Sequence, residues 1–183
     1  MTALRITAGT LRGRKIPIPR GEVRPTSERA RQAYFNIVGE RIINARFLDL
    51  FAGSGIFSFE AVSRGAASSL AIDEWRESNL GIEKIAKNLE APIEVMTAEV
   101  LEGLKRLGKR EFDLVYADPP YAYAHYDPLV SALDAAPLAD GALIAVEHRR
   151  RTTPFTTEPS RLRFSRRAEY GEVWITFYET GEP

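Results

Sequence analysis

The sequence predicts an α/β fold with a mainly parallel sheet of seven strands and helices on both faces. Two observations lead to this prediction. From Arg46 onward, short apolar strands alternate with helical segments, an order typical of a parallel sheet that is covered on both sides. The first of these strands also runs into a glycine turn that opens a helix, which is how nucleotide-binding units of such folds begin.

The expected elements follow one another in a regular order. The strands of the sheet are expected near 47–50, 70–72, 93–96, 112–117, 142–147, 162–166 and 173–178. Helices are expected over 55–64, 76–89, 100–107 and 128–135, and an amphipathic helix over 27–43 precedes the first strand. Right-handed crossovers bring the carboxyl ends of parallel strands to one edge of the sheet, where ligands bind.

The N-terminal region has a different pattern. The segments 4–8 and 15–18 both alternate between apolar and polar residues, and the stretch from Gly9 to Gly13 between them can turn. This pattern predicts an exposed basic hairpin. We therefore divide the chain into a hairpin arm over residues 1–25 and one α/β domain over residues 26–183, with the arm as an extension of that domain.

Composition excludes several classes of site. The 183 residues include no cysteine, which excludes disulfides, thiolate metal sites and thiol nucleophiles. With only two histidines, His125 and His148, we expect no metal centre. The chain shows neither a secretory signal nor an apolar run of roughly 18 residues. We expect a cytoplasmic protein without a membrane anchor.

Charge is distributed unevenly along a chain that is neutral overall. Residues 1–46 hold ten Arg and Lys against three acids, whereas residues 47–146 hold eight against sixteen. Residues 147–170 hold seven arginines against three glutamates. Clustered arginine is the electrostatic signature of a protein that binds a polyanion. Solvated surface charges that are unevenly distributed along the chain by chance would give similar counts.

The glycine turn and the acids near it predict a nucleotide-like ligand. Gly53 and Gly55 follow the first strand directly, and glycines there let a ligand approach the backbone at a helix N-terminus. Asp73 lies 20 residues beyond Gly53, at the end of the second strand, where an acid can accept both hydroxyls of a ribose. Glu99 follows the third strand, either as an acceptor for an adenine amine or as a helix N-terminal acid.

Two cofactors fit a glycine turn followed by an acid, a nicotinamide dinucleotide and S-adenosylmethionine. The dinucleotide fingerprint requires a third glycine, and Ser58 stands in its place. The fourth strand then ends in Asp118, Pro119, Pro120 and Tyr121. Because prolines fix φ and remove a backbone donor, this corner is a rigid acceptor site beside an aromatic ring.

That corner suits methyl transfer to the exocyclic amine of a nucleic-acid base. The lone pair of such an amine is delocalised into the ring, so the amine is a poor nucleophile. The Asp118 carboxylate and the Pro119 carbonyl could accept both amine hydrogens and localise the lone pair toward the methyl donor. The Tyr121 ring could stack on a base that has left its helix.

Taken together, these segments resemble the RsmD family of bacterial S-adenosylmethionine-dependent methyltransferases. The resemblance rests on "RITAGTLRGRKIPIP", "RPTSERARQAYFNI", "LDLFAGSGIFSFEAVSRGA", "FDLVYADPPY" and "EYGEVWITFYE", which extend from about Arg5 to Glu179. It implies a Rossmann-like class I methyltransferase fold and methylation of a guanine N2 amine in small-subunit (16S) ribosomal RNA.

The resemblance also implies roles for particular residues. The catalytic residues would be Asp118, Pro119 and Tyr121. S-adenosylmethionine would be held by Asp49, Phe51, Gly53, Gly55, Asp73, Glu99 and Asp118. RNA would be bound by Arg12, Arg14, Lys15, Arg24, Arg29 and Arg31. The chain departs from the family pattern at Ser58, where the family usually has glycine, a change expected to affect helix packing beside the cofactor.

Two other functions remain open. A DNA adenine-N6 methyltransferase shares the acid-Pro-Pro-aromatic corner, although such enzymes usually carry a separate target-recognition segment for which this chain has no room. A non-catalytic RNA-binding or ribosome assembly factor could keep the fold. Under the favoured interpretation the partner is 16S ribosomal RNA, within a small ribosomal subunit or an assembly intermediate, and the protein acts as a monomer without a metal.

Overall fold

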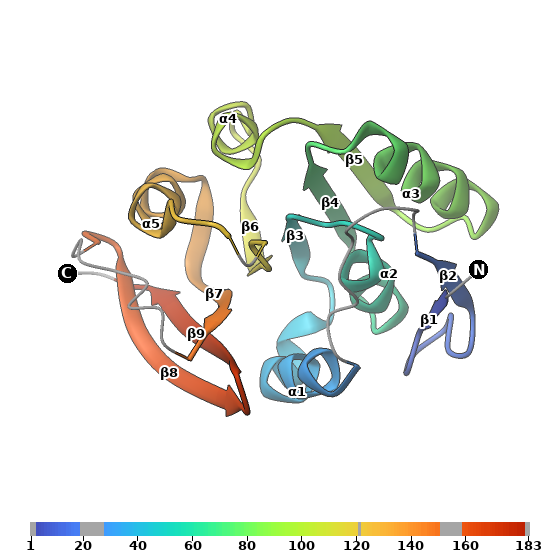
Figure 1. The fold of residues 1–183 in the computed structure, drawn as a ribbon, viewed down its shortest axis with the longest axis horizontal. Helices are drawn as coiled ribbons and strands as arrows, with labels where there is room; N and C mark the ends of the chain where they lie inside the picture. The colour runs from blue at the N-terminus through green and yellow to red at the C-terminus, as the bar shows by residue number, and fades with distance from the viewer. Residues whose placement is uncertain (1–2, 19–27, 121, 151–158, 182–183) are drawn as a thin grey trace.

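The main sheet has the predicted seven strands. The computed structural model describes residues 3–18, 28–120, 122–150 and 159–181. The strands are β3 (Arg46–Leu50), β4 (Ser68–Asp73), β5 (Ile93–Thr97), β6 (Phe112–Ala117), β7 (Leu138–Arg149), β8 (Leu162–Tyr170) and β9 (Val173–Thr180). Their order across the sheet is β5-β4-β3-β6-β7-β9-β8 (Figure 1). Neighbours from β5 to β7 pair in parallel, and β9 pairs antiparallel with β7 and β8, so the predicted fold class is confirmed.

The helices also agree with the sequence pattern, with small differences at their ends. They are α1 (Glu28–Val38), α2 (Ile56–Ser63), α3 (Arg76–Asn88), α4 (Val100–Lys105) and α5 (Tyr126–Ala135). The helix expected to continue to residue 43 changes at Gly39, where φ is +54°, into a short 3-10 turn, η1 (Gly39–Ile42). Among the described residues, no helix is long and apolar enough to cross a membrane.

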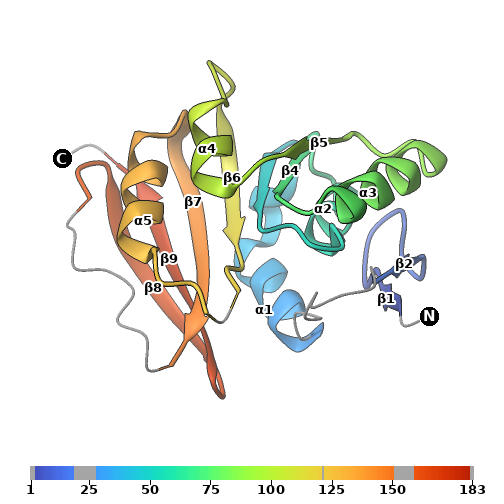
Figure 2. The ribbon, with the colours of Figure 1, turned by 45° about the horizontal axis from the view of Figure 1, so that its top comes forward.

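Helices cover the sheet on both faces and divide the core into two clusters. On one face, α1, α2 and α3 pack against the sheet, and the rings of Phe57 and Tyr116 stack with centroids 3.8 Å apart. On the other face, Leu104 of α4 and Leu129 of α5 pack against the sheet (Figure 2). Because both faces are covered, the strand ends are where the sheet remains open to a ligand.

The N-terminal hairpin is fastened to α2. It consists of β1 (Ala3–Arg5) and β2 (Lys15–Pro17), which pair antiparallel. The buried Glu60 carboxylate accepts hydrogen bonds from the backbone N–H of Thr7 at 2.9 Å and of Ala8 at 3.1 Å. Gly9 lies so close to α2 that a Cβ there would be 1.7 Å from the Ser63 carbonyl oxygen. The basic arm is therefore held in a fixed position beside α2.

Candidate functional site

The turn after β3 has the backbone conformation of a ligand-binding loop. Phe51, Gly53 and Gly55 all have positive φ, at +59°, +53° and +72°. A large residue such as Phe51 rarely adopts this conformation, and such strain concentrates at functional sites. A Cβ on Gly55 would lie 2.8 Å from Cγ1 of Ile82, so both the φ angle and the packing require glycine there.

Asp73 is attached to this turn from the neighbouring strand. Its Oδ2 accepts a hydrogen bond from the Gly53 N–H at 2.8 Å, and its Oδ1 accepts one from the Trp75 N–H at 2.9 Å. A carboxylate has about four acceptor positions, so Asp73 can accept two further hydrogen bonds. The structure thus brings together the glycine turn and the acid at the end of β4, as the spacing predicted.

Asp49 lies beneath the turn instead of lining it. Its side chain is buried, and its Oδ2 accepts hydrogen bonds from the Ser58 N–H at 3.0 Å and the Ser58 hydroxyl at 2.7 Å. Ser69 donates in turn to the Ser58 hydroxyl at 3.0 Å. The pKa of Asp49 is raised to about 7, mainly by burial. The hydrogen bonds from Ser58 lower the pKa, and the nearby Asp73 and Asp118 carboxylates raise it. Ser58, the departure from the family pattern, is thus part of a buried network that fixes the start of α2.

Asp118 and Pro119 form the second side of the site. The Asp118 N–H donates to the carbonyl of Leu50 at 3.4 Å, which places the end of β6 directly beside the start of the glycine turn. Asp118 is half-buried, Pro119 is buried, and both line a small hollow. The other lining residues are Tyr126, Glu147, His148, Arg149 and Val173. Tyr121, the predicted stacking residue, lies outside the described residues.

The hollow at Asp118 is smaller than a nucleic-acid base. Its volume is about 10 Å³, which is about the space of one water molecule. Glu147 is buried in its wall and accepts a hydrogen bond from the hydroxyl of Tyr116 at 2.6 Å. This hollow is therefore too small to hold a purine.

Glu99 caps a helix. Of its two predicted roles, the structure shows the helix N-terminal one, because its Oε2 accepts a hydrogen bond from the Glu102 N–H at 3.1 Å as α4 begins. The side chain is exposed at the same edge as Asp73. A contact with an adenine amine stays a prediction.

Four of the six predicted RNA-binding residues have exposed side chains. These are Arg12, Arg14, Lys15 and Arg29. Arg24 lies outside the described residues. Arg31 does not fit the predicted role, because it is fully buried between α1, α2 and the hairpin. Its Nη2 donates to the carbonyl of Arg5 at 2.9 Å and its Nε lies 3.5 Å from Oε2 of Glu60. Arg31 is therefore a structural arginine that holds the hairpin to α1.

The sequence analysis missed Asn79, which joins two strand ends at the site. Its Nδ2 donates to the Asp73 carbonyl at 2.8 Å and to the Thr97 hydroxyl at 2.9 Å. Within the described residues, its buried Oδ1 has no hydrogen-bond partner. The available signal was a polar residue on the buried face of the helix over 76–89, which helical periodicity could have identified.

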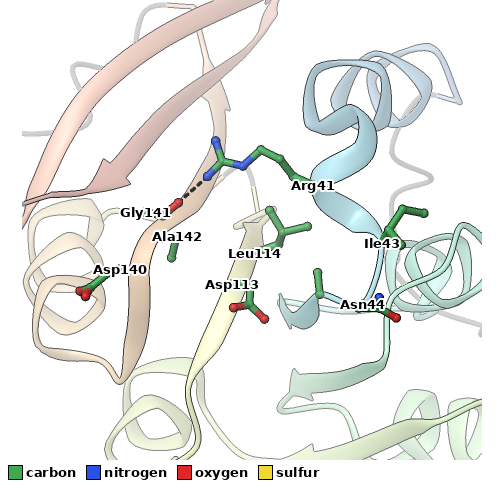
Figure 3. Close-up of a pocket in the computed structure, with 9 residues that line it drawn as sticks. Arg41, Ile43, Asn44, Asp113, Leu114, Asp140, Gly141 and Ala142 are labelled. Atoms are coloured by element: carbon green, nitrogen blue, oxygen red, sulfur yellow. Dashed lines mark hydrogen bonds between the residues drawn. The ribbon is translucent and has the colours of Figure 1, made fainter.

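A larger hollow of about 330 Å³ lies at the opposite edge of the sheet (Figure 3). Arg41 reaches over it and donates a hydrogen bond to the carbonyl of Gly141, while Asp113 and Leu114 line it from the start of β6. Parallel sheets bind ligands at their carboxyl edge, and this hollow lies at the amino ends of β3, β6 and β7. We therefore place the candidate site at Asp118, despite the smaller space there.

Comparison with known proteins identifies the family. The model of the family described as "Conserved hypothetical protein 95" matches residues 4–179. The chain is 36% identical over 147 residues to ribosomal RNA small subunit methyltransferase D of Escherichia coli, with 79% of this chain and 74% of the relative covered. It is 28% identical over 183 residues to a Bacillus subtilis protein named as an rRNA methyltransferase, covering 96% of this chain and 98% of that protein.

A solved structure gives the same result for the whole chain. An Escherichia coli structure described as a "putative methyltransferase" superposes with a TM-score of 0.87 at 32% identity and covers 100% of both chains. The family model and the relatives therefore confirm the resemblance found in the sequence. The chain belongs to the family of ribosomal RNA small subunit methyltransferase D.

Proposed function

We propose that this protein transfers a methyl group from S-adenosylmethionine to the exocyclic N2 amine of a guanine in 16S ribosomal RNA. The family is one of ribosomal RNA methyltransferases, and the fold is that of a class I methyltransferase. The observation that carries the chemistry is the hydrogen bond from the Asp118 N–H to the Leu50 carbonyl, because it holds the acceptor corner against the turn that receives the donor.

The residues around the turn fit S-adenosylmethionine. Gly55, the N-cap residue of α2, has no side chain to cap the helix, and Asp49 accepts the N–H of Ser58 one turn further in. The positive end of the helix at Gly55 can therefore meet the carboxylate of the cofactor. Asp73 keeps acceptor positions for the ribose hydroxyls. The Asp73 and Asp118 carboxylates give this edge a negative field that suits a cationic ligand, and after burial, the main cause, they contribute to the raised pKa of Asp49. When bound, the cofactor supplies a methyl group activated by a positively charged sulfur.

Asp118 and Pro119 act on the acceptor. Each accepts one hydrogen of the guanine N2 amine, through a carboxylate oxygen and a backbone carbonyl. This geometry orients the nitrogen lone pair toward the donor and stabilises the positive charge that develops on nitrogen during transfer. The amine nitrogen would receive the methyl group that the bound cofactor would supply, and one amine proton would then leave to solvent. Tyr121 supplies the stacking surface that keeps the base in place.

We further propose that the substrate is the RNA of a small ribosomal subunit or of an assembly intermediate, and that the protein acts as a monomer. The exposed basic hairpin supports a nucleic-acid partner. The fixed position of that hairpin beside α2 supports one rigid docking surface on a single chain.

Methyl transfer with a labelled donor tests the proposal. The protein is incubated with S-adenosylmethionine carrying a labelled methyl group and, in parallel, with small ribosomal subunits, naked 16S ribosomal RNA and duplex DNA. The label is expected in RNA, and nucleoside analysis is expected to recover it as N2-methylguanosine. Recovery as N6-methyl-2′-deoxyadenosine from DNA would support the alternative DNA methyltransferase. Tight RNA binding without transfer to any substrate would support a non-catalytic assembly factor.

A further inference from the structure

A continuous row of side-chain contacts runs along the carboxyl edge of the sheet. It starts beside the glycine turn at Phe51. The centroid of the Phe51 ring lies 5.1 Å from that of the Tyr123 ring. Tyr123 and Tyr126 follow at 5.3 Å, Tyr126 and His148 at 6.5 Å, and His148 and Trp174 at 6.2 Å. Phe51 directly follows β3, and Tyr123 and Tyr126 lie between β6 and β7, at the start of α5. Since His148 is in β7 and Trp174 in β9, the row crosses the sheet in strand order.

The row ends at an exposed arginine on the outer strand. The guanidinium of Arg167 in β8 lies over the ring of Trp174, 4.9 Å from its centroid. Arg167 is exposed and Trp174 is half-buried, whereas Tyr126 and His148 in the middle of the row are buried. The accessible part of the row is thus its outer end, where a cation and an indole face lie together.

The surroundings of this end are basic and partly aromatic. The described parts of residues 149–172 contain six arginines and two glutamates. Phe164, also in β8, pairs with Tyr178, and Arg167 pairs with Thr176, so both side chains lie on the same face of the sheet. Phe164 is 61% exposed. Basic residues on an edge strand can have no other function than to prevent edge-to-edge aggregation. A large exposed aromatic residue on the same strand argues against that explanation, because it would favour aggregation.

The position of this surface matches the path of an RNA strand. Three strand-to-strand steps separate β6 from β8, which corresponds to about 15 Å at the usual strand spacing. A nucleotide close to a target base at Asp118 can therefore reach Trp174 and Arg167. Single-stranded RNA is bound by such pairs, since bases stack on aromatic rings and arginine contacts phosphates.

We propose that β8 and β9 carry a second RNA-binding surface, centred on Arg167 and Trp174, that holds the strand flanking the target base. This inference rests on the proposed function, because it takes RNA as the substrate. It assigns a role to the second basic stretch of the sequence, which the predicted RNA-binding residues did not include.

RNA binding at a series of salt concentrations tests the surface. Arg167→Gln, Trp174→Ala and Trp174→Phe are compared with wild type on naked 16S ribosomal RNA and, in parallel, on small ribosomal subunits, with Arg106→Gln as the matched control. Arg106 is an exposed arginine at the end of α4, close to the amino end of β6. S-adenosylhomocysteine is present throughout, and its binding to each variant checks that the domain is folded.

Each variant has a defined expected result. Arg167→Gln should lower the slope of log affinity against log salt by about 0.7, the contribution of one phosphate contact on a single strand. Trp174→Ala should weaken RNA binding about 5- to 150-fold, and Trp174→Phe should retain most of the affinity because a ring remains. In methyl transfer, Arg167→Gln should raise the KM for RNA with little change in kcat.

Three outcomes separate the possibilities. If Arg167→Gln and the folded Trp174 variants bind RNA like Arg106→Gln, the surface does not contact RNA. If they lose affinity for small subunits but bind naked RNA normally, the partner is a ribosomal protein and the inference is wrong. If wild type transfers no methyl group to RNA, the proposed function fails, while the salt slopes still decide whether the surface binds RNA.

Discussion

At the scale of single residues, Asp118 and Asp49 are two carboxyl groups at the candidate site with different environments. Asp118 is half-buried and lines the hollow at the end of β6, whereas Asp49 is buried beneath the turn and bonded to Ser58. Asp118 can therefore contact the reacting amine, and Asp49 acts through the backbone of α2. Replacing each residue should affect a different measurable property.

Asp118→Ala should lower methyl transfer at least about 100-fold, because it removes an acceptor whose hydrogen bond strengthens as charge develops on the amine. Affinity for S-adenosylhomocysteine, measured by calorimetry, should stay within a few-fold of wild type. Asp140→Ala, at an exposed acid on the opposite edge of the sheet, serves as the control. Loss of cofactor binding in Asp118→Ala would show that this carboxylate holds the donor and not the acceptor.

Asp49 should make the stability of the protein depend on pH. Its pKa is 3.8 in the unfolded chain and about 7 in the folded protein, so between these values the folded protein keeps a proton that the unfolded chain has lost. Stability should therefore fall as pH rises from about 4 to about 7, and level off above that range. Asp49→Asn lacks this pH-dependent contribution to stability, because an asparagine side chain does not ionise.

The difference between wild type and Asp49→Asn isolates this group from the other carboxylates. Urea unfolding of both proteins between pH 4 and 8 should show the variant gaining relative stability as pH rises, at most by about 1.4 kcal/mol per pH unit. Parallel pH profiles for the two proteins would mean that Asp49 ionises in the folded protein as it does in water.

At the scale of elements, Glu60 connects the N-terminal hairpin, α1 and α2. Its buried carboxylate accepts hydrogen bonds from Thr7 and Ala8, and it pairs with Arg64 at 2.8 Å and with Arg31 at 3.5 Å. Burial lowers the pKa of Arg31, and the Glu60 carboxylate opposes this effect more strongly than that of Glu28. The three elements should therefore lose stability together when Glu60 changes.

Glu60→Gln should destabilise the protein by about 3–5 kcal/mol, because it leaves the buried Arg31 without its counter-charge. Chemical denaturation measures the loss. Glu94→Gln is the matched control, since Glu94 pairs with Arg110 on the surface and both side chains are mostly exposed. If Glu60→Gln and Glu94→Gln unfold at the same denaturant concentration, the ion pair between Glu60 and Arg31 does not hold the hairpin.

Much of the secondary structure and part of the candidate site could be predicted from periodicity and turn residues, because both of these signals are present in the local sequence. The parallel pairing of the strands near the site followed from the alternation of strands and helices, and the glycine turn and Asp73 met as their spacing suggested. Long-range contacts could not be predicted in the same way. Arg31 resembled a surface arginine within "RPTSERAR", and only the hairpin and Glu60, 29 residues further along, explain its burial.

The ends of elements were also less predictable than their existence. The strand expected from residue 142 begins at Leu138, because the Asp140-Gly141 pair, with Gly141 at φ +70°, resembles a turn in sequence but lies within β7. The pairing of β7 with β6 shifts register at this point. Such an irregularity depends on the neighbouring strand and leaves no local sequence pattern.

At the scale of the whole molecule, the candidate site lies between two basic surfaces. Figure 1, in which the longest axis is horizontal, shows the hairpin at one end and β8 at the other, and Figure 2 shows the same separation. Strands β3 and β6, whose carboxyl ends carry the glycine turn and Asp118, lie between them. An RNA that contacts both surfaces would therefore cross the site on its way along the molecule.

The hairpin should then contribute to RNA affinity independently of β8. Replacing both Arg12 and Arg14 by alanine should reduce the salt slope of 16S ribosomal RNA binding by about 1.4, or about 0.7 for each lost phosphate contact. Adding Arg167→Gln should reduce it by about 0.7 more, because contacts at opposite ends of the molecule share no partner and their effects add. The control carries alanine at Arg106 and Lys109, two exposed residues after α4. An unchanged slope in the hairpin variant would exclude Arg12 and Arg14 as phosphate contacts, and a combined effect smaller than the sum would mean that the RNA engages only one surface at a time.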